Sequence, residues 1–296
     1  LSGGDRKSLT PGHNEVTDCH IHHYSRWSKT YRPAVAISGV GNRVAHNLIH
    51  DAPHNAIQLG GNQHVIEYNE VHHVCQETAD VGAFYMGRDW TQRENVIRYN
   101  FFHHLGGFGG RDDAFSQAIA IYLDDWSSGT DIIGNVVYKG GYGVLIGGGR
   151  NNLVKNNIFV DCNPAVHVDS RGLGWAKYYF NGDTTTLTDR LEAMDYKNPP
   201  YSERYPELLS LYDDDPAVAK YNRILNNIMV GEGKTIHLQD GLDDTIVEIK
   251  DNWTEGDPGF VDPGKMNFNL KADSPVFEAG FQQIPFDKIG PRKKDR

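Results

Sequence analysis

The hydrophobic residues of this chain recur in short segments that return at a near-constant spacing. One type of segment places two or three apolar residues directly after an asparagine, as in residues 47–50 and 100–103. A second type alternates apolar and other residues, as in 56–60 and 83–87. Alternation with a period of two is typical of a β-strand with one buried face. The pattern therefore predicts a chain of short strands.

The asparagines give the period of the repeat. They stand at Asn47, Asn69, Asn100, Asn135, Asn157 and Asn227, so the spacings are 22, 31, 35, 22 and 70 residues. A base period of 22 with three insertions of roughly 9, 13 and 48 residues fits these spacings. A repeat this short cannot hold a pair of helices but fits a few short strands separated by turns. We predict an all-β, right-handed parallel β-helix in which the asparagine side chains form an inward ladder at one turn.

Stacking successive coils predicts which side chains lie above one another, about 4.8 Å apart. One inward column contains only apolar residues and forms the core: Val35, Ile57, Phe84, Ile121, Val144, Val166 and Ile236. The outward column beside it is mixed and reads Ala36, Gln58, Tyr85, Tyr122, Leu145, His167 and His237. An outward column from the other strand reads His22, His50, His72, His103 and Tyr138. We expect binding or catalysis on these outward columns.

We interpret residues 1–296 as a single β-helix domain with two departures from the repeat. The insertion at 173–220 is predicted to be partly helical, with a helix over 186–194, a turn at 198–203 and a second short helix at 205–212. The segment 257–296 is Pro-rich and is expected to be a loop-rich cap on the last coil. Leu1–Gly4 matches the end of a strand, so we expect either that earlier coils precede it or that a partner covers this end.

Composition and charge narrow the partners. Of 296 residues, 39% are hydrophobic and 23% charged, which is typical of a folded protein, and the net charge of −10 argues against a nucleic-acid partner. No apolar run has the length of a membrane span, and the N-terminus has no signal-peptide pattern, so a membrane partner is not expected. Cys19, Cys75 and Cys162 are too few for a disulfide framework and are predicted to be buried thiols. Oligomeric state is left open.

Two acidic residues on neighbouring coils suit hydrolysis of a glycosidic bond, which needs one carboxylic acid and one carboxylate. Asp80 precedes the strand predicted at 81–86, and Asp124 ends the equivalent strand one coil later, followed directly by Asp125. Because these coils are adjacent, we expect Asp80 and Asp124 to face one cleft. Asp80, Asp124 and Asp125 are the candidate catalytic residues.

Side chains suited to sugar binding surround these acids. Aromatic faces stack on sugar rings, while His, Arg and Asp side chains hydrogen-bond to hydroxyls. Glycines at the ends of neighbouring strands leave room beside Asp124. The candidate substrate-binding residues are His72, Tyr85, Arg88, Trp90, His103, Tyr122, Trp126, His167 and Asp169.

Each candidate also has a purely structural interpretation. Asp80 could cap a turn, and the pair at 124–125 could be a solvated turn or bind calcium. The histidine column could be a stacked ladder that the repeat produces without any metal. Arg88–Trp90 could be a local ion pair beside a packed tryptophan. No metal or other cofactor is predicted, and calcium is kept as an alternative.

Several short runs resemble bacterial right-handed parallel β-helix proteins of polysaccharide breakdown. They are Gly87–Trp90, Tyr122–Asp125, Arg171–Trp175 and Asp257–Asp262, together with the coil sequence itself. The chain is most similar, in our interpretation, to glycoside hydrolase family 141, whose members are linked to fucosidase and xylanase activity. The resemblance implies a catalytic pair of Asp residues on neighbouring coils, and Asp80 and Asp124 are the positions that fit.

The sequence therefore favours a carbohydrate-active glycoside hydrolase that acts on a plant, algal or microbial polysaccharide, outside the cell or in the periplasm. A polysaccharide lyase or uronate epimerase is the first alternative, with His103, Tyr122 and Arg88 available to take the C5 proton or neutralise the uronate. A non-catalytic glycan-binding module is the second alternative. The products released from glycans would separate the three.

Overall fold

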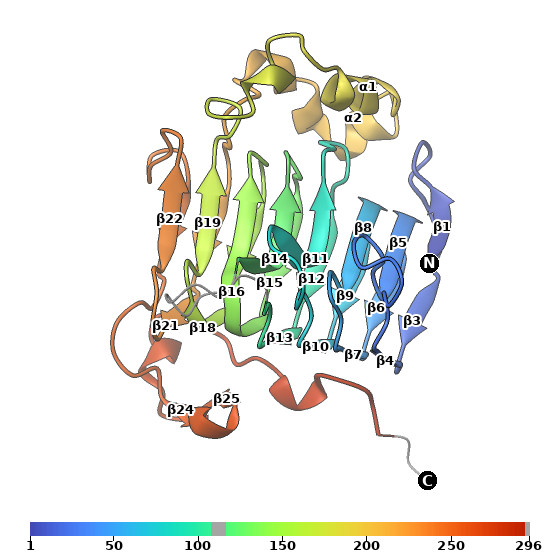
Figure 1. Ribbon diagram of the computed structural model, residues 1–296. Helices are drawn as coiled ribbons and strands as arrows, with labels where there is room; N and C mark the ends of the chain where they lie inside the picture. Colours follow the sequence, from blue (N-terminus) through green and yellow to red (C-terminus); the bar gives the residue numbers. More distant parts are fainter. Residues whose placement is uncertain (108–116, 294–296) are drawn as a thin grey trace.

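The computed structural model describes residues 1–107 and 117–293, and it is a parallel β-helix (Figure 1). Each coil passes through three strands that pair with the same strands of the coils before and after it. We number the faces of the solenoid in the order sheet 1, sheet 2 and sheet 3, as the chain passes through them. The predicted fold class is confirmed.

The strands of the three sheets follow one another in strict rotation. Sheet 1 contains β1 (Ser2–Asp5), β5 (Val35–Val40), β8 (Ile57–Asn62), β11 (Val81–Gly87), β14 (Ala118–Asp124), the end of β16 (Val136–Gly147), β19 (Val166–Asp169) and β22 (Ile236–Gln239). Sheet 2 contains β3 (Glu15–Thr17), β6 (Arg43–Ala45), β9 (Val65–Glu67), β12 (Asn95–Arg98), β15 (Thr130–Ile133), β17 (Leu153–Lys155), β20 (Arg223–Leu225) and β23 (Glu248–Lys250). Sheet 3 contains β4 (His20–His22), β7 (Leu48–His50), β10 (Glu70–His72), β13 (Phe101–His103), the start of β16, β18 (Ile158–Cys162) and β21 (Ile228–Val230). Outside them lies β2 (Thr10–Pro11), which pairs with β1.

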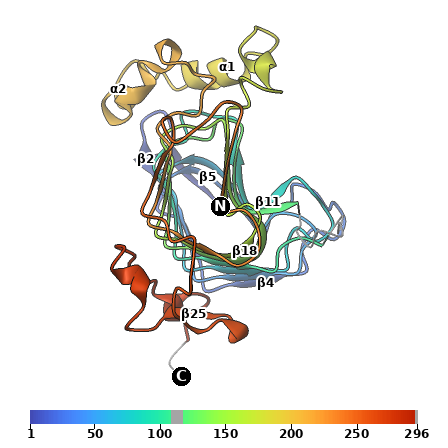
Figure 2. The same ribbon diagram turned by 90° about the vertical axis from the view of Figure 1, so that its left-hand side faces the viewer.

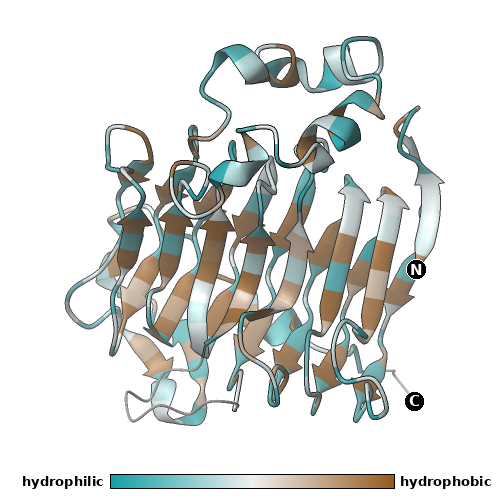
Figure 3. Ribbon diagram, turned by 45° about the horizontal axis from the view of Figure 1, so that its top comes forward, coloured by the Kyte–Doolittle hydropathy of each residue, from teal (hydrophilic) through white to brown (hydrophobic). Residues whose placement is uncertain are grey.

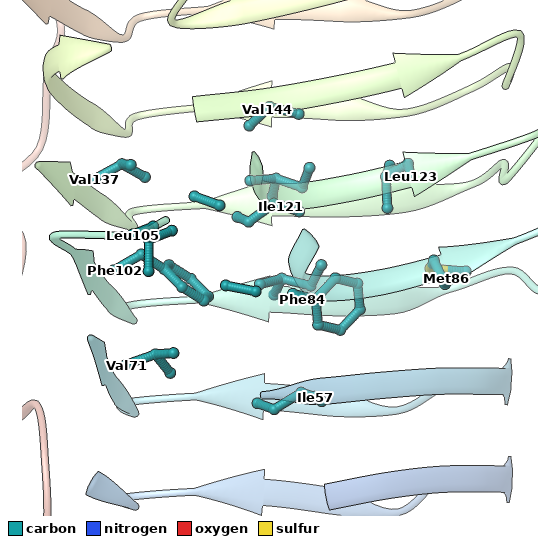
Figure 4. Close-up of a cluster of buried hydrophobic side chains, with 14 of the residues drawn as sticks. Ile57, Val71, Phe84, Met86, Phe102, Leu105, Ile121, Leu123, Val137 and Val144 are labelled. Atoms are coloured by element: carbon teal, nitrogen blue, oxygen red, sulfur yellow. The ribbon is translucent and has the colours of Figure 1, made fainter. Parts of the chain in front are cut away.

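The core fills the space between the three sheets. The register of β11 with β14 pairs Phe84 with Ile121 and Tyr85 with Tyr122, so the predicted inward and outward columns are confirmed there. Phe84 and Ile121 are fully buried and meet side chains from sheet 3 inside the solenoid (Figure 4). Hydrophobic and hydrophilic positions alternate along the strands, as the sequence pattern requires (Figure 3).

The predicted asparagine ladder lies at the turn between sheets 2 and 3. The side-chain amide of Asn69 donates to Oδ1 of Asn100, and that of Asn100 to Oδ1 of Asn135, both across 2.9 Å. The same side chains also donate to backbone carbonyls of the preceding coil. A second ladder at the turn between sheets 1 and 2, with members such as Asn152 and Asn222, was not predicted. Together the ladders satisfy buried backbone groups that the turns leave without strand partners.

The long insertion forms a partly helical cover over the ends of the sheet 1 strands (Figure 1). Its elements are α1 (Thr186–Glu192), α2 (Tyr201–Arg204) and three 3-10 turns at Lys177–Tyr179, Pro206–Leu208 and Leu211–Asp213. The first predicted helix is confirmed, but the predicted turn at 198–203 instead contains the start of α2. Its Tyr201 is fully buried, so packing of this side chain stabilises the helical turn directly after two prolines.

The sequence predicts that the C-terminal segment caps the last coil, but in the structure the segment extends well beyond that coil. After β24 (Phe260–Asp262) and β25 (Asn267–Leu270) it runs back along the outside of the solenoid beneath sheet 3 (Figures 1 and 2). Its 3-10 turns are Pro263–Lys265, Pro275–Phe277 and Phe286–Lys288. Gly290 donates its backbone N–H to the carbonyl of Tyr68, and Arg292 pairs with Asp18 in the first coil. The segment buries apolar side chains that sheet 3 would otherwise expose, which include Phe101 and Val136.

Candidate active site

The acidic and tyrosine side chains predicted for catalysis meet on the outward face of sheet 1, over β11, β14, β16 and β19. The loops that lead into sheet 1 project outward beside β11, and the helical insertion lies beyond the other ends of the strands (Figure 2). A sharp bend at Gly82 begins β11: a Cβ there would lie 2.3 Å from the carbonyl oxygen of Phe84 and 2.6 Å from Cβ of Tyr122. Only glycine fits this bend. Asp80, two residues earlier, is exposed and reaches the hydroxyl of Tyr122 on β14.

Two tyrosines connect Asp80 with Asp124. The hydroxyl of Tyr122 donates to Oδ1 of Asp80 across 3.1 Å, and that of Tyr85 donates to Oδ2 of Asp124 across 2.9 Å. The two rings meet edge to face, with their centroids 5.5 Å apart. Burial raises the pKa of Tyr122, and the charge of Asp124 raises it further. Asp80 and Asp124 therefore face a common site, although Asp80 precedes its strand and Asp124 ends its own.

Arg171 is the centre of the charge network behind Asp124. Its Nη1 atom lies 2.6 Å from Oδ1 of Asp124 and 2.8 Å from Oδ1 of Asp125, and its Nη2 atom lies 2.9 Å from Oδ2 of Asp169. All four side chains are almost fully buried. The guanidinium lies over Gly147, where a Cβ would come within 2.1 Å of it. Arg171 therefore occupies the space that Gly147 leaves in this column by having no side chain.

Arg88 supplies a second positive charge from the solvent side. Its Nε atom lies 2.9 Å from Oδ2 of Asp125, and its Nη1 atom donates to the hydroxyl of Tyr85 across 2.9 Å. That hydroxyl in turn donates to Oδ2 of Asp124 across 2.9 Å. Burial and the charge of Asp124 raise the pKa of Asp125, while Arg171 and Arg88 oppose the shift. Asp124 is thus held by two donors, Tyr85 and Arg171, from two different coils, in a fixed orientation.

His167 and Asp169 extend the site along β19. The Nε2 atom of His167 lies 3.4 Å from Oδ2 of Asp169, and its Nδ1 atom lies 3.0 Å from Nδ1 of His237. Burial raises the pKa of Asp169, but hydrogen bonds with His167 and Arg171 outweigh it and lower the pKa to about 2. Asp169 is therefore a carboxylate that keeps Arg171 and His167 in place.

Two predicted sugar-binding residues are buried instead. Trp90 and Trp126 are 1% and 0% exposed and pack against the helical insertion. They cannot stack on a sugar ring, so this prediction was wrong. The sequence placed them just beyond the strands, and it gave no sign that the insertion folds back over them. Asp89 pairs with Arg6 rather than with Arg88, so the predicted local ion pair is also wrong.

His72 and His103 lie on sheet 3, away from the carboxylate site. Their ring contacts are with other histidines of the column and with Phe101. The prediction that they bind substrate beside Asp80 and Asp124 is therefore not supported by their position. The column alignment itself is confirmed, because β7, β10 and β13 pair His50 with His72 and His72 with His103. The repeat pattern does not show that a turn of the solenoid separates the histidine column on sheet 3 from the tyrosine column on sheet 1.

Two groups of residues near the site were missed. Arg171 occurs in a run quoted above only for its family resemblance, although it follows a β-strand by two residues. Trp175 is 63% exposed, its ring lies 5.5 Å from the Arg171 guanidinium, and it contacts Tyr178. An exposed aromatic pair beside the carboxylates is better placed for sugar stacking than Trp90 or Trp126. Asp112 and Asp113, which the sequence places in the insertion of roughly 13 residues after Asn100, lie outside the described residues. Cys19 is exposed, unlike Cys75 and Cys162, so it is not a buried thiol as predicted.

The comparison with protein families agrees with the fold. A family model for the right-handed β-helix region matches residues 33–188, more than half of the chain. The chain belongs to this right-handed β-helix family. Its matched residues include Asp80, Asp124, Asp125, Asp169 and Arg171. Searches of curated proteins and of solved structures gave no match.

Members of the right-handed β-helix family include polysaccharide-degrading enzymes and other proteins. Membership therefore supports the architecture and leaves the chemistry to the site itself. Among the described residues, none of the helices is long and apolar enough to cross a membrane.

Proposed function

We propose that this right-handed β-helix is a carbohydrate-active glycoside hydrolase with Asp80 and Asp124 as its catalytic pair. The observation that carries the proposal is the pair of touching tyrosines on β11 and β14, in which Tyr122 donates to Asp80 and Tyr85 donates to Asp124. Glycosidases hold two carboxyl groups across the scissile bond. Two adjacent tyrosines that each hold one carboxylate support such an arrangement.

The environments of the two acids suit different roles. Asp124 is 6% exposed and accepts from Tyr85 and Arg171, so it is the better candidate for the ionised group that attacks the sugar or activates water. Asp80 is exposed and accepts from Tyr122, so it is the better candidate for the group that protonates the leaving oxygen. Asp125 lies deeper, between Arg88 and Arg171, and we assign it to positioning these two guanidinium groups.

The polysaccharide would lie along the outward face of sheet 1. Trp175 and Tyr178 offer exposed rings at one edge, and Arg88, whose side chain is 43% exposed, offers donors to hydroxyls. His167 is buried and has partners at both ring nitrogens, so it is assigned to positioning Asp169 rather than to binding sugar. No calcium ion is needed at the acids in this proposal, because Arg171 already supplies positive charge between Asp124, Asp125 and Asp169. An extracellular or periplasmic location belongs to the proposal, since such a polymer is found there.

The lyase alternative has weaker support. It needs a base and a positive group together at the uronate, but His103 lies on sheet 3, apart from Tyr122 and Arg88. Burial and the charge of Asp124 raise the pKa of Tyr122, which disfavours the tyrosinate that would take the proton. A glycan-binding module would use the same face without turnover.

A glycan panel scored for new reducing ends and for unsaturated products tests the proposal. Asp80→Asn and Asp124→Asn should each lower the rate on an accepted glycan by at least about 10²-fold. Asp131→Asn, a matched change on sheet 2, should leave the rate unchanged. Unsaturated uronides would favour the lyase, and binding without any product would favour the glycan-binding module. Full activity of either Asn variant would contradict the assignment of the pair.

A further inference from the structure

Sheet 3 carries a second group of chemically capable side chains that the proposed function does not use. Glu70 and His72 lie on β10, and His103 lies on β13 one coil later. Each of the three offers one potential metal-ligating atom, and these atoms all lie within 4.8 Å of one another. The Nε2 atom of His103 and Oε1 of Glu70 are 3.3 Å apart.

Glu70 is an exception within its column. The parallel register pairs it with Leu48 in the coil before and with Phe101 in the coil after. The following coils place Val136 and Ile158 at this position, where both are buried under the C-terminal segment. Apart from His20 in the first coil, the other members of this column are apolar. A single carboxylate among them, directly beside two histidines, is not explained by stacking of the repeat.

The two imidazoles are oriented as metal ligands usually are. The Nδ1 atom of His72 lies 2.7 Å from Nδ1 of His73, and that of His103 lies 2.9 Å from Nδ1 of His104. A partner at one ring nitrogen fixes the ring and leaves the other nitrogen, here Nε2, available for a metal ion. The rings of His72 and His103 stack with centroids 4.7 Å apart and an angle of 19° between their planes. Both rings therefore present their free edges on the same side.

The group lies at the surface of sheet 3, with His103 buried and with Glu70 and His72 half-buried. The Glu70 side chain is 34% exposed, so water can reach the site and complete the coordination.

We propose that Glu70, His72 and His103 bind a divalent transition-metal ion of the zinc class, with water as a fourth ligand. Ligands about 2.0–2.1 Å from a tetrahedral zinc ion lie about 3.4 Å apart. The contact between Glu70 and His103 already has this length, and the widest separation in the group must close by roughly 1.4 Å, which side-chain rotation supplies. Two imidazoles and one carboxylate suit zinc, cobalt, nickel or copper better than calcium, which prefers oxygen ligands.

The ion would join two successive coils on sheet 3, whereas the carboxylate site lies on sheet 1. It would also lie beside the returning C-terminal segment, since a Cβ at Gly290 would be 3.5 Å from Oε2 of Glu70. This inference is independent of the hydrolase proposal, because none of its ligands belongs to the carboxylate site. Failure of the metal-site proposal would leave the hydrolase proposal unaffected, and the reverse also holds.

Titration of the tag-free, chelator-treated full chain with Co²⁺ tests the site through the visible absorption of four-coordinate cobalt, followed by displacement with Zn²⁺. We expect one ion per chain and a loss of affinity of more than about 100-fold in Glu70→Gln, because even outer-shell changes cost 10- to 100-fold. His50→Gln, one coil earlier in the same column, should bind as tightly as the wild type.

Three results would overturn the proposal. They are no cobalt signal in the wild type, unchanged affinity in Glu70→Gln, and an equal loss in His50→Gln, which would indicate non-specific binding along the whole histidine column. Circular dichroism of each variant separates loss of a ligand from loss of the fold.

Discussion

The outward faces of sheets 1 and 3 are built by the same repeat but differ in how their columns change along the solenoid. On sheet 3, His22, His50, His72 and His103 succeed one another and stack ring on ring. On sheet 1, the equivalent column changes at nearly every coil. A repeated side chain is what the solenoid produces by itself, whereas a change in residue type needs a separate cause.

This difference locates the chemistry in both faces. On sheet 1, Asp124 stands in register with Gly87 in the coil before, and Asp169 with Gly147. On sheet 3, Glu70 stands between Leu48 and Phe101. In each case the residue that departs from its column is an acid, and a positive or metal-ligating group lies beside it. The predictions below test whether departures from the column matter more than its repeated members.

The largest expected effect on stability comes from removing Arg171. Arg171→Met leaves Asp124, Asp125 and Asp169 buried together without their shared partner, and loss of one member of a buried charge group costs about 3–5 kcal/mol. Urea denaturation should show this loss in the free energy of unfolding. Arg88→Met, in which the lost side chain is 43% exposed, should cost less than about 1 kcal/mol. Equal losses would contradict a special place for Arg171.

The pH dependence of stability should reveal Asp169. Its folded pKa of about 2 lies below the ordinary value of 3.8, so its contribution is fully present above pH 3.8 and is lost as pH falls toward 2. The contribution is about 2 kcal/mol. Asp125, with its raised pKa, acts in the opposite direction, so the informative quantity is the slope of stability against pH in Asp169→Asn relative to the wild type. An unchanged slope between pH 4 and 2 would show that Asp169 is not ion-paired.

A repeated member of the sheet 3 column should tolerate replacement. His50 is followed in its column by His72 and His103 and then by Tyr138, so a second flat ring fits the stack. We expect His50→Tyr to change the free energy of unfolding by less than about 1 kcal/mol. Thermal melting checks this value. A loss as large as that of Arg171→Met would remove the distinction between the two faces.

The smallest expected effect on stability is at Trp175. This side chain is 63% exposed, so Trp175→Ala should alter the free energy of unfolding by less than about 0.5 kcal/mol. If its ring stacks on substrate, KM should still rise by roughly 10-fold, as the loss of about 1.4 kcal/mol of binding would produce. The buried Trp126 offers the contrast, since Trp126→Ala should destabilise the fold by about 3–5 kcal/mol. An unchanged KM in Trp175→Ala would exclude it from the substrate-binding surface.

The sequence predicted the fold well because spacing and alternation are local properties of the chain. Asn47 and Asn69 fix the coil length, and the alternation around Phe84 fixes which side chains point inward. Arg171 could not be placed in this way, because 47 residues separate it from Asp124. The only sign of its position in the repeat is Gly147, whose missing side chain leaves the space for the guanidinium. The burial of Trp126 depends on an insertion that folds back over it.

The position of sheet 3 was equally hidden. The alignment placed His72 and His103 correctly in one column, but the turn between sheets 3 and 1 sets the angle between that column and Tyr122, and a repeat pattern does not encode an angle. Likewise, the C-terminal segment has no repeat, so its return along sheet 3 depends on apolar contacts such as that of Phe286 with Phe101.

The central claim is that Asp80 and Asp124 act together across the Tyr85–Tyr122 pair. The most direct test is the rate of reducing-end release by Asp80→Asn, Asp124→Asn and the double variant on one accepted glycan. Catalytic groups that act as a unit are strongly non-additive. We predict that the double variant is no slower than about 10-fold below the slower single variant. Multiplication of the two single losses in the double variant, or a single variant with wild-type rate, would contradict the account.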